Sequence, residues 1–378
     1  MQTDARALAR VRAALGFALD APLVSSFFFL HFLCPTSLVM PQEPNSEHSQ
    51  ASHLRTETTP SGGESAQDSA AASRAGELAL GHVLALLTVA VWGVTFVSTK
   101  VLLAVLTPVE ILCIRFVLGY VFLWVLWPRR MGRATRAQEK IFFLAGLSGI
   151  CLYYLVENIA LVYTRASNVG VIVCLSPFFT AILGSLLARF QGGGERLGGW
   201  FFAGLVISLA GVALICWGGE ESVEFNWRGD LLAACAGFVW AVYSLLVKRI
   251  TAWGFAALPV TRRIFFWGIV CMVPVTIYDG FDVSVEELLD PVVGGNLVFL
   301  GLVASALCFV FWSMSVKALG ALASTVYIYL VPVITVGTAI VVLDEPFTPM
   351  VVLGMLCVIA GLVCAQAAEA ILARIRRK

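Results

Sequence analysis

The sequence predicts an all-α membrane protein of ten transmembrane helices, arranged as two inverted repeats of five helices each. Three observations lead to this prediction: a membrane-like composition, an alternation of charge between the apolar segments, and an internal repeat. Of the 378 residues, 59% are apolar and 13% are charged, whereas soluble domains are about half apolar and about a quarter charged. A soluble domain is therefore excluded.

Ten apolar segments of about 20 residues are bounded by charges or by Gly and Pro, as membrane-spanning helices are. The predicted spans are 80–104, 107–127, 141–163, 166–188, 200–218, 230–248, 261–278, 295–315, 321–343 and 348–370. The connections between them are short, so no separate soluble domain fits between the helices.

Basic residues collect in every second connection, a pattern that identifies the cytoplasmic side of a membrane protein. One set of connections, together with the C-terminal tail, holds sixteen Lys and Arg residues. The alternate set holds only Arg165 and Arg228 and is otherwise acidic. We therefore expect a multi-pass protein of the inner cell membrane with both termini in the cytoplasm.

The N-terminal extension, residues 1–78, does not fit this pattern. Residues 13–34 are apolar, but Asp20 and Pro22 interrupt them, and a span here would reverse the charge topology of all later helices. The segment is expected to lie at the membrane interface, to be a signal peptide without the usual cleavage site, or to precede the true start at Met40. The polar stretch after Met40 is typical of a disordered leader.

The second half of the chain repeats the first. VWGVTFVSTK at 91–100 aligns with VWAVYSLLVK at 239–248, and LSPFFT at 175–180 aligns with LVPVIT at 330–335. Each copy has five helices, and because this number is odd, the second copy enters the membrane from the opposite side and is inverted. Many secondary transporters have such inverted repeats and bind substrate between the two halves. The predicted parts are the extension 1–78, repeat 1 over 79–218, an outer linker over 219–229, repeat 2 over 230–370 and a basic cytoplasmic tail over 371–378.

These residues resemble the EamA branch of the drug/metabolite transporter superfamily. The likeness rests on the tryptophan-centred first helix of each half, on RFVLGY in the second helix, on the Pro-containing fourth helix, and on the GERL and DEPFT turns before the fifth. It covers residues 80–368. The resemblance implies a ten-helix bundle around a central cavity. It also implies that the protein transports a small metabolite such as an amino acid, often outward. The Gly pair after GERL and the N-terminal extension depart from the family pattern.

Ionisable and aromatic residues inside the predicted spans are the candidate site. Arg115 and Glu157 stand out because charged groups within spans are costly and usually face a bundle interior. From the helix ends they lie roughly 12 and 9 Å deep, so we expect a charge pair between them. The predicted substrate-binding residues are Trp92, Arg115, Tyr154, Glu157, Asn158, Trp240 and Tyr243. The alternative is packing for the aromatic residues and a purely structural role for the ion pair.

Pro177 and Pro332 occupy equivalent mid-helix places in the two halves. A proline there removes a backbone hydrogen bond and bends the helix, so both are predicted hinges. The alternative is that they are ordinary prolines of spanning helices, where this residue is common.

Several function classes are disfavoured by what the predicted spans contain. The four histidines lie at or before the start of the first span, which argues against histidine-ligated metals and histidine-based nucleophiles in the bundle. No cofactor is expected, and without a Walker motif ATP is not a direct energy source. A net charge of +1 argues against nucleic acid as a partner. The predicted class is therefore a transporter and not an enzyme.

The expected partners are a small-molecule substrate, the lipid bilayer and, if protons drive transport, a coupling proton carried by Glu157. A homodimer is left open by the sequence. Two other functions are also left open: a membrane-embedded enzyme, which would need a polar catalytic cluster at one face, and a non-transporting receptor or assembly factor, which would need a larger surface outside the membrane.

Overall fold

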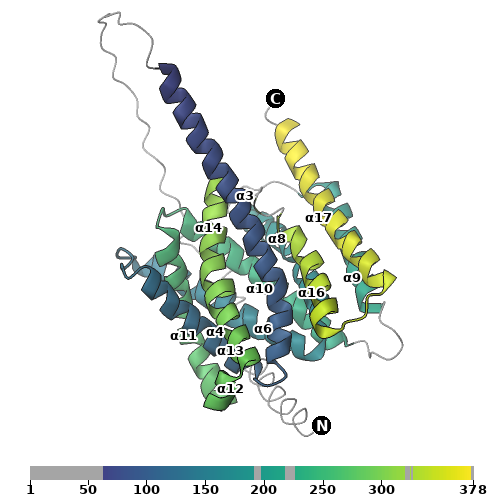
Figure 1. Cartoon of the computed structure of the whole chain (residues 1–378). Helices are drawn as coiled ribbons and strands as arrows, with labels where there is room; N and C mark the ends of the chain where they lie inside the picture. The colour runs from purple at the N-terminus through teal and green to yellow at the C-terminus, as the bar shows by residue number, and fades with distance from the viewer. Residues whose placement is uncertain (1–62, 191–196, 218–225, 320–323, 325–326, 376–378) are drawn as a thin grey trace, which may run out of the picture. The chain divides into compact units, whose positions relative to one another are not determined.

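The structure, a computed structural model of the chain, describes residues 63–190, 197–217, 226–319, 324 and 327–375 (Figure 1). Helices joined by short connections make up these residues, and no strand occurs among them. Residues 78–378 form one compact unit, which is the unit considered below. The expectations for segment 13–34 and for a start at Met40 fall outside the described residues.

The helices follow one another as α3 (Gly63–Leu102), α4 (Pro108–Leu126), α5 (Arg136–Gly146), η1 (Leu147–Leu152), α6 (Tyr153–Tyr163), α7 (Ala166–Val173), α8 (Ser176–Phe190), α9 (Gly199–Trp217), α10 (Trp227–Thr251), α11 (Ala257–Asp279), α12 (Val285–Leu289), α13 (Pro291–Val298), η2 (Phe299–Leu307), α14 (Cys308–Leu319), η3 (Ile328–Leu330), α16 (Val331–Leu343) and α17 (Pro349–Ile375).

Seven helical segments are long and apolar enough to cross a membrane, and each coincides with a predicted span. They are Ala75–Leu102, Pro108–Leu126, Arg136–Tyr163, Ala166–Phe190, Trp227–Thr251, Ala257–Asp279 and Pro291–Leu319. Three shorter apolar helices, Gly199–Ile215, Ile328–Leu343 and Pro349–Ala365, occupy the remaining three predicted spans. The all-α membrane architecture is thus confirmed, and the count of ten spanning helices stays a prediction.

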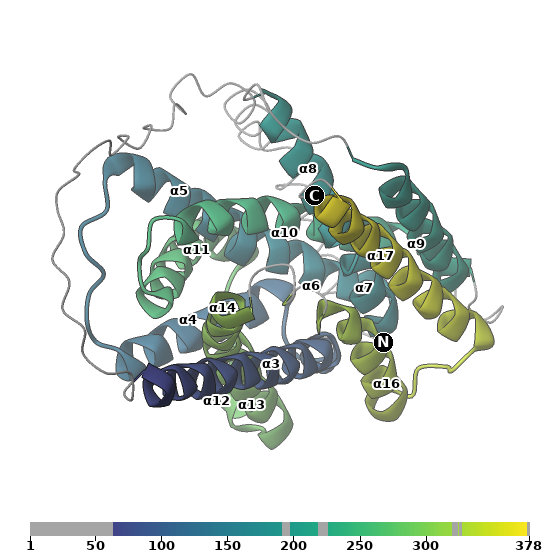
Figure 2. The same ribbon diagram turned by 90° about the horizontal axis from the view of Figure 1, so that it is seen from above.

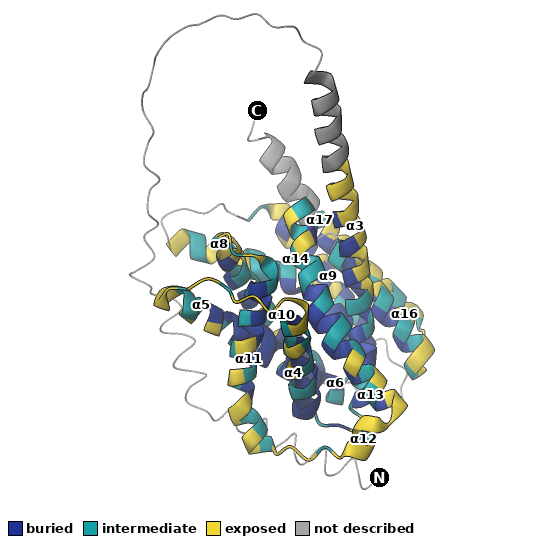
Figure 3. Ribbon diagram, turned by 60° about the vertical axis from the view of Figure 1, so that its left-hand side comes forward, coloured by how far each residue is buried: buried dark blue, intermediate teal, exposed yellow. Residues whose placement is uncertain are grey.

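The distribution of polarity suits a lipid environment. Large apolar side chains such as Val125, Ile277 and Val341 are 75%, 78% and 80% exposed, whereas Arg115 and Glu157 are each 1% exposed. A bilayer favours this arrangement, in which polar groups lie inside the bundle and apolar groups lie on its surface. The short helix α12, which has no buried residue, is coloured as exposed in Figure 3.

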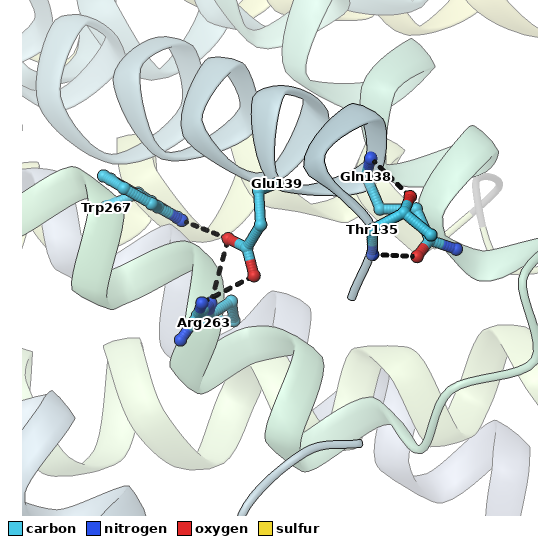
Figure 4. A network of polar contacts seen from close by, with 5 residues as sticks. All are labelled: Thr135, Gln138, Glu139, Arg263 and Trp267. Atoms are coloured by element: carbon cyan, nitrogen blue, oxygen red, sulfur yellow. Dashed lines mark hydrogen bonds and ion pairs between the residues drawn. The ribbon is translucent and has the colours of Figure 1, made fainter. Parts of the chain in front are cut away.

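Local sequence sets where several helices begin. Thr135 precedes α5, and its hydroxyl accepts a hydrogen bond from the Gln138 amide while the Gln138 side chain accepts one from the Thr135 amide (Figure 4). The same reciprocal cap joins Thr107 to Glu110 at the start of α4. Such caps satisfy amides that have no partner within the helix, so they fix the first turn.

The third helix of each half contains a π-helical segment at an equivalent position. The Tyr153 amide donates to the Ser148 carbonyl at the end of η1, and the Cys308 amide donates to the Val303 carbonyl at the end of η2. Ser148 and Val303 lie 155 positions apart, as do the aligned prolines 177 and 332. The repeat therefore extends to backbone irregularities, which are frequent at functional sites.

The predicted proline bends take a different form in the structure. Pro177 lies in the first turn of α8, after a turn at Cys174 and Leu175 that separates α8 from α7. Pro332 lies in the first turn of α16, directly after the 3-10 turn η3. The expectation of a bend inside a continuous helix is thus corrected: the helix is interrupted before each proline. A first-turn proline costs no hydrogen bond, because its amide would have no partner there.

The fifth helices of the two halves, α9 and α17, lie side by side (Figure 2). Their backbones come together at Gly204 and Gly211 of α9 and at Gly354 and Gly361 of α17. The Ser208 hydroxyl donates across this interface to the Val358 carbonyl at 3.2 Å. Small residues allow such close approach, which supplies much of the stability of helix pairs in membranes.

Candidate functional site

Trp92 of α3 and Trp240 of α10, which align in the repeat, lie in edge-to-face contact at the interface of the two halves. Their ring centroids are 6.2 Å apart with an interplanar angle of 83°. Trp312 and Phe309 of α14 lie 5.4 and 5.8 Å from the Trp92 ring. The Trp92 indole donates to the Ala304 carbonyl of η2 at 3.2 Å, so the π-helical segment helps to orient this ring.

Three tyrosines extend this aromatic cluster, Tyr153 and Tyr154 from α6 of the first half and Tyr243 from α10 of the second. Tyr153 lies 4.8 Å from Trp240 and 4.6 Å from Tyr154, and Tyr243 lies 5.0 Å from Trp240, all between ring centroids. The three tyrosines are 5–7% exposed. The structure thus brings the predicted residues Trp92, Tyr154, Trp240 and Tyr243 into one continuous cluster.

Arg115 of α4 is fixed by the second half of the protein. Its Nε donates to the Ser305 hydroxyl of η2 at 2.6 Å. Its Cζ atom lies 4.3 Å from the centroid of the Tyr154 ring, which is within the range of a cation–π contact. Arg115 therefore links both halves and adjoins the aromatic cluster.

Glu157 and Asn158 of α6 are each 1% exposed. The Asn158 side-chain amide donates to the Pro108 carbonyl at 3.0 Å. Neither carboxylate oxygen of Glu157 has a hydrogen-bond partner among the described residues, and the same holds for the side-chain oxygen of Asn158. Arg115 and Tyr153 both interact electrostatically with Glu157, and the Tyr153 hydroxyl is a weak hydrogen-bond donor to the carboxylate that falls outside full hydrogen-bond geometry.

The predicted ion pair between Arg115 and Glu157 is not formed in the structure. The ion pair within 4 Å in the described part of the chain is that of Arg263 with Glu139, at 2.5 Å (Figure 4). The physical reason is the placement of Arg115, whose side chain is drawn to Ser305 and to the face of Tyr154. The two charges share a region of the bundle without direct contact.

Sequence inspection missed Ser305, Phe309 and Trp312. Phe309 and Trp312 lie 155 positions after Tyr154 and Glu157, so the spacing of the repeated prolines would have pointed to both. Trp312 contacts Trp92 at the interface between the halves. Because Glu157 is the equivalent of Trp312 in the first half, this contact indicates that Glu157 also faces the interface. No sequence signal identified Ser305, because its role depends on the π-helical segment that carries it.

A second polar cluster surrounds the turn that joins α6 to α7, residues 164–167. Lys100 donates to the carbonyls of Leu161 and Thr164, at the end of α6. The Glu345 carboxylate accepts from the amides of Ala166 and Ser167, at the start of α7. A cation at a helix C-terminus and an anion at an N-terminus are the favourable placements. We refer to this set of contacts as the Lys100 cluster.

The second half supplies two of the charges in the Lys100 cluster. Glu345 precedes α17, and its Oε2 also accepts from the Ser167 hydroxyl at 2.5 Å. Asp230 of α10 accepts from the Thr164 hydroxyl at 2.9 Å. The cluster therefore ties the two halves together at one end of the helices. Within the described ranges, no three His, Cys, Asp or Glu side chains are grouped so as to hold a metal ion.

Comparison with known proteins gives a consistent family match. The model of the EamA-like transporter family matches the chain twice, over residues 79–217 and 227–365. An uncharacterized transporter of Archaeoglobus fulgidus is 29% identical over 74% of this chain and 95% of its own length. A probable amino-acid metabolite efflux pump of Escherichia coli K12 is 26% identical over 74% of this chain and 92% of its own.

A probable terminal-alkyne amino-acid exporter of Streptantibioticus cattleyicolor is 28% identical over 61% of this chain and 74% of its own. A protein of known crystal structure superposes with a TM-score of 0.54 at 19% identity, over 77% of this chain and 98% of its own, which is a likeness of fold alone. The double family match agrees with the internal repeat and with the resemblance that the motifs indicated.

Proposed function

Because the chain belongs to the EamA-like transporter family, we propose that it is a secondary transporter that exports a small metabolite, such as an amino acid, by alternating access. It is a multi-pass membrane protein that acts on a small molecule. The named relatives from Escherichia coli and Streptantibioticus cattleyicolor, a probable efflux pump and a probable exporter, support the outward direction and the substrate class. The proposed location is the inner membrane, with both termini in the cytoplasm.

The proposed substrate site comprises the predicted residues around the interface of the halves. The aromatic members Trp92, Tyr154, Trp240 and Tyr243 provide the apolar wall. The polar members Arg115, Glu157 and Asn158 provide the charges and hydrogen-bonding groups. A largely apolar site with a few convergent polar groups is the usual composition of a small-molecule site.

The observation that supports alternating access most strongly is a difference between two equivalent lysines. Lys100 and Lys248 align in the repeat. The Lys100 side chain is partly buried and bonded to the end of α6, whereas the Lys248 side chain is exposed and makes no hydrogen bond or ion pair with a described residue. Inverted repeats in different conformations give one closed end and one open end, and exchange of the two conformations moves the opening across the membrane.

The alignment of the two repeats also predicts partners for Lys248 in the opposite conformation, in which the other end of the protein is closed. Val316 and Leu319 lie 155 positions after Leu161 and Thr164, whose carbonyls accept from Lys100. We therefore expect Lys248 to bond to the carbonyls of Val316 and Leu319 when Lys100 is released. The helix interruptions before Pro177 and Pro332 are the proposed hinges of this exchange, because segments on either side can rotate with little loss of hydrogen bonding.

The proposed function is tested by metabolite profiling of the medium. Cells that overproduce the protein should accumulate at least one small metabolite outside, and cells without its gene should lose that metabolite from the medium. No difference in the medium, with the protein present in the membrane, would contradict export.

Reversible cross-linking of the Lys100 cluster provides the matched control for this assay. Ser167→Cys and Glu345→Cys, in a background without the other cysteines, place thiols at positions whose native side chains touch. A short thiol cross-linker should stop export by holding the Lys100 cluster closed, and reduction should restore it. Continued export by fully cross-linked protein would exclude alternating access through this end.

A further inference from the structure

The connection between α4 and α5 and the start of α5 carry exposed cations that have no partner among the described residues. These five basic side chains form neither a hydrogen bond nor an ion pair with a described residue. The connection runs along the edge of the bundle (Figure 2). We refer to the five residues as the α4–α5 basic surface, which comprises Arg129, Arg130, Arg133, Arg136 and Lys140.

No neighbouring carboxylate neutralises the α4–α5 basic surface. Glu139 is the acidic residue of segment 127–140, and the second half of the protein occupies both its oxygens. Its Oε1 accepts from Arg263 at 2.5 Å, and its Oε2 accepts from the Trp267 indole at 3.0 Å (Figure 4). Residues 248–263, which end α10 and begin α11, contain four more basic residues and no acidic one. This region of the protein is therefore strongly positive.

The backbone of the connection is held in place at both of its ends. Arg262 of α11 donates to the carbonyls of Trp127 and Arg129, each at 2.5 Å, and its Cζ atom lies 3.8 Å from the centroid of the Trp124 ring. At the other end, the reciprocal cap at Thr135 fixes the first turn of α5. A backbone that is fixed in advance lowers the entropic cost of binding a ligand.

Exposed apolar side chains lie directly before the α4–α5 basic surface. Val125, Leu126 and Trp127 at the end of α4 are 75%, 45% and 40% exposed. The Cζ atom of Arg129 lies 5.1 Å from the centroid of the Trp127 ring. Tryptophan is enriched at the level of the lipid headgroups, with apolar residues on its membrane side. The cations therefore begin at headgroup level, next to side chains that contact acyl chains.

The equivalent connection of the second half has the opposite charge. Residues 279–295 contain five acidic residues and no basic one, although they too follow exposed apolar side chains, those of Ile277 and Tyr278. Orientation of the chain in the membrane needs only the number of basic residues on one side. It does not need a fixed backbone or adjoining apolar side chains, so the α4–α5 basic surface has features beyond those of an orientation signal.

From this juxtaposition we propose that the α4–α5 basic surface binds the phosphate headgroup of an anionic phospholipid, with the acyl chains of the lipid against Val125 and Leu126. This inference goes beyond the proposed function and does not depend on which molecule is transported. Arginine side chains bind phosphate oxygens through paired N–H groups. Basic clusters next to a spanning helix are typical of sites for anionic lipids.

The charge of the surface selects among lipids, and its apolar border selects a lipid over a soluble anion. The headgroup of phosphatidylcholine brings its own cation toward Arg130 and Arg133, so the attraction to its phosphate is largely cancelled. The headgroup of phosphatidylglycerol has no such cation. Soluble glycerol phosphate presents the same phosphate group but has no acyl chain to cover the exposed side chains of Val125 and Leu126.

The test is native mass spectrometry of the purified full chain in detergent, titrated with phosphatidylglycerol, phosphatidylcholine or glycerol phosphate. We expect phosphatidylglycerol to bind at the lowest concentration and glycerol phosphate not to displace it. The double variant Arg130→Gln with Arg133→Gln should weaken the binding of phosphatidylglycerol by about fivefold for each residue, or about 30-fold for the pair. Both side chains are exposed, so the variant is expected to fold normally.

The matched control is the double variant Arg189→Gln with Lys317→Gln. These two side chains are also exposed, have no partner among the described residues and lie in the last turns of α8 and α14. The control removes the same charge from the same side of the predicted topology, and it should leave the affinity for phosphatidylglycerol unchanged. Size-exclusion chromatography shows that each variant is folded before its affinity is measured.

Three results would overturn the lipid site. Equal affinity for phosphatidylcholine and phosphatidylglycerol would show that the cations do not select the headgroup. An equal loss of affinity in the control variant would assign the binding to the total charge of this side of the protein. Displacement of phosphatidylglycerol by glycerol phosphate would assign the surface to a soluble anion. Because the assay measures lipid binding and not transport, none of these results bears on the proposed function.

Discussion

Gly204 of α9 lies so close to Gly361 of α17 that a Cβ atom on Gly204 would be 2.3 Å from the Gly361 carbonyl oxygen. Gly211 and Gly354 repeat this relationship, with a Cβ on Gly211 placed 2.5 Å from the Gly354 carbonyl oxygen. Gly204 aligns with Gly354 in the repeat, and Gly211 aligns with Gly361. Replacing both glycines of one contact by their equivalents therefore gives the other contact, as in a two-fold symmetric interface.

Gly204→Val should weaken the pairing of α9 with α17, because the backbone atoms opposite cannot move away as a flexible side chain would. Overpacking of this kind typically costs about 1–3 kcal/mol. Gly337→Ala in α16 is the control, since no atom of the described residues lies within 4 Å of the place that its Cβ would take. Thermal unfolding in detergent measures both, and equal stability of the two variants would show that the helices can separate without loss.

Arg262→Gln should destabilise the protein far more than Arg263→Gln does, although the two residues are adjacent. Arg262 is 5% exposed, donates to the carbonyls of Trp127 and Arg129 after the end of α4, and lies 3.8 Å from the centroid of the Trp124 ring. Hydrogen bonds to a charged group contribute about 1.5–3 kcal/mol, so a loss of at least this size is expected.

Arg263 instead forms a partly exposed ion pair with Glu139, whose side-chain exposures are 40% and 24%. Exposed pairs of this kind contribute about 0.2–1 kcal/mol. Thermal unfolding with matched Gln variants measures the difference between the two arginines. A larger effect of Arg263→Gln would mean that the Glu139 contact, which also receives the Trp267 indole at 3.0 Å, matters more than the cap of α4.

Lys100→Met and Lys248→Met should shift the conformational balance in opposite directions. Removal of the Lys100 bonds frees the end of α6 and favours opening at that end, whereas Lys248→Met removes only the contact expected in the opposite state. Two charge-assisted bonds correspond to a population change of about tenfold or more. The readout is labelling of a single cysteine at position 167, which is 4% exposed as serine, by an impermeant thiol reagent.

We expect labelling of position 167 to rise with Lys100→Met and to fall with Lys248→Met. Arg249→Gln is the matched charge control, because the Arg249 side chain is exposed, adjoins Lys248 and has no partner among the described residues. This variant should leave labelling unchanged. Shifts of the same sign for both lysine variants would contradict the equivalence of the two ends.

The sixteen-to-two distribution of basic residues predicts which connections face outward. In a background without cysteines, Val285→Cys in α12 should react with an impermeant thiol reagent added to intact cells, because Val285 is 70% exposed. Gly132→Cys, with no atom of the described residues near its side-chain position, should react only after the cells are opened. Labelling of position 132 in intact cells would reverse the proposed orientation.

The sequence by itself determined the elements and their order. Apolar length and flanking charge located the apolar helices, seven of which are long enough to span a membrane, and the aligned motifs around Trp92 and Trp240 identified the two halves. It also identified Arg115 and Glu157 as buried groups, because a charge in the middle of an apolar helix can only face the bundle interior. These features depend on composition and on the rise along one helix, both of which are local.

Only the tertiary structure decided what each side chain contacts. Depth suggested that Arg115 would meet Glu157, but the rotation of each helix about its axis, set by packing against its neighbours, brought Arg115 to Ser305 instead. Packing likewise decided that Lys100 bonds to the turn between the third and fourth helices, and that the helices of Gly204 and Gly361 cross at these two residues. Rotation and crossing depend on the summed packing of all helices, and no single segment of the sequence encodes them.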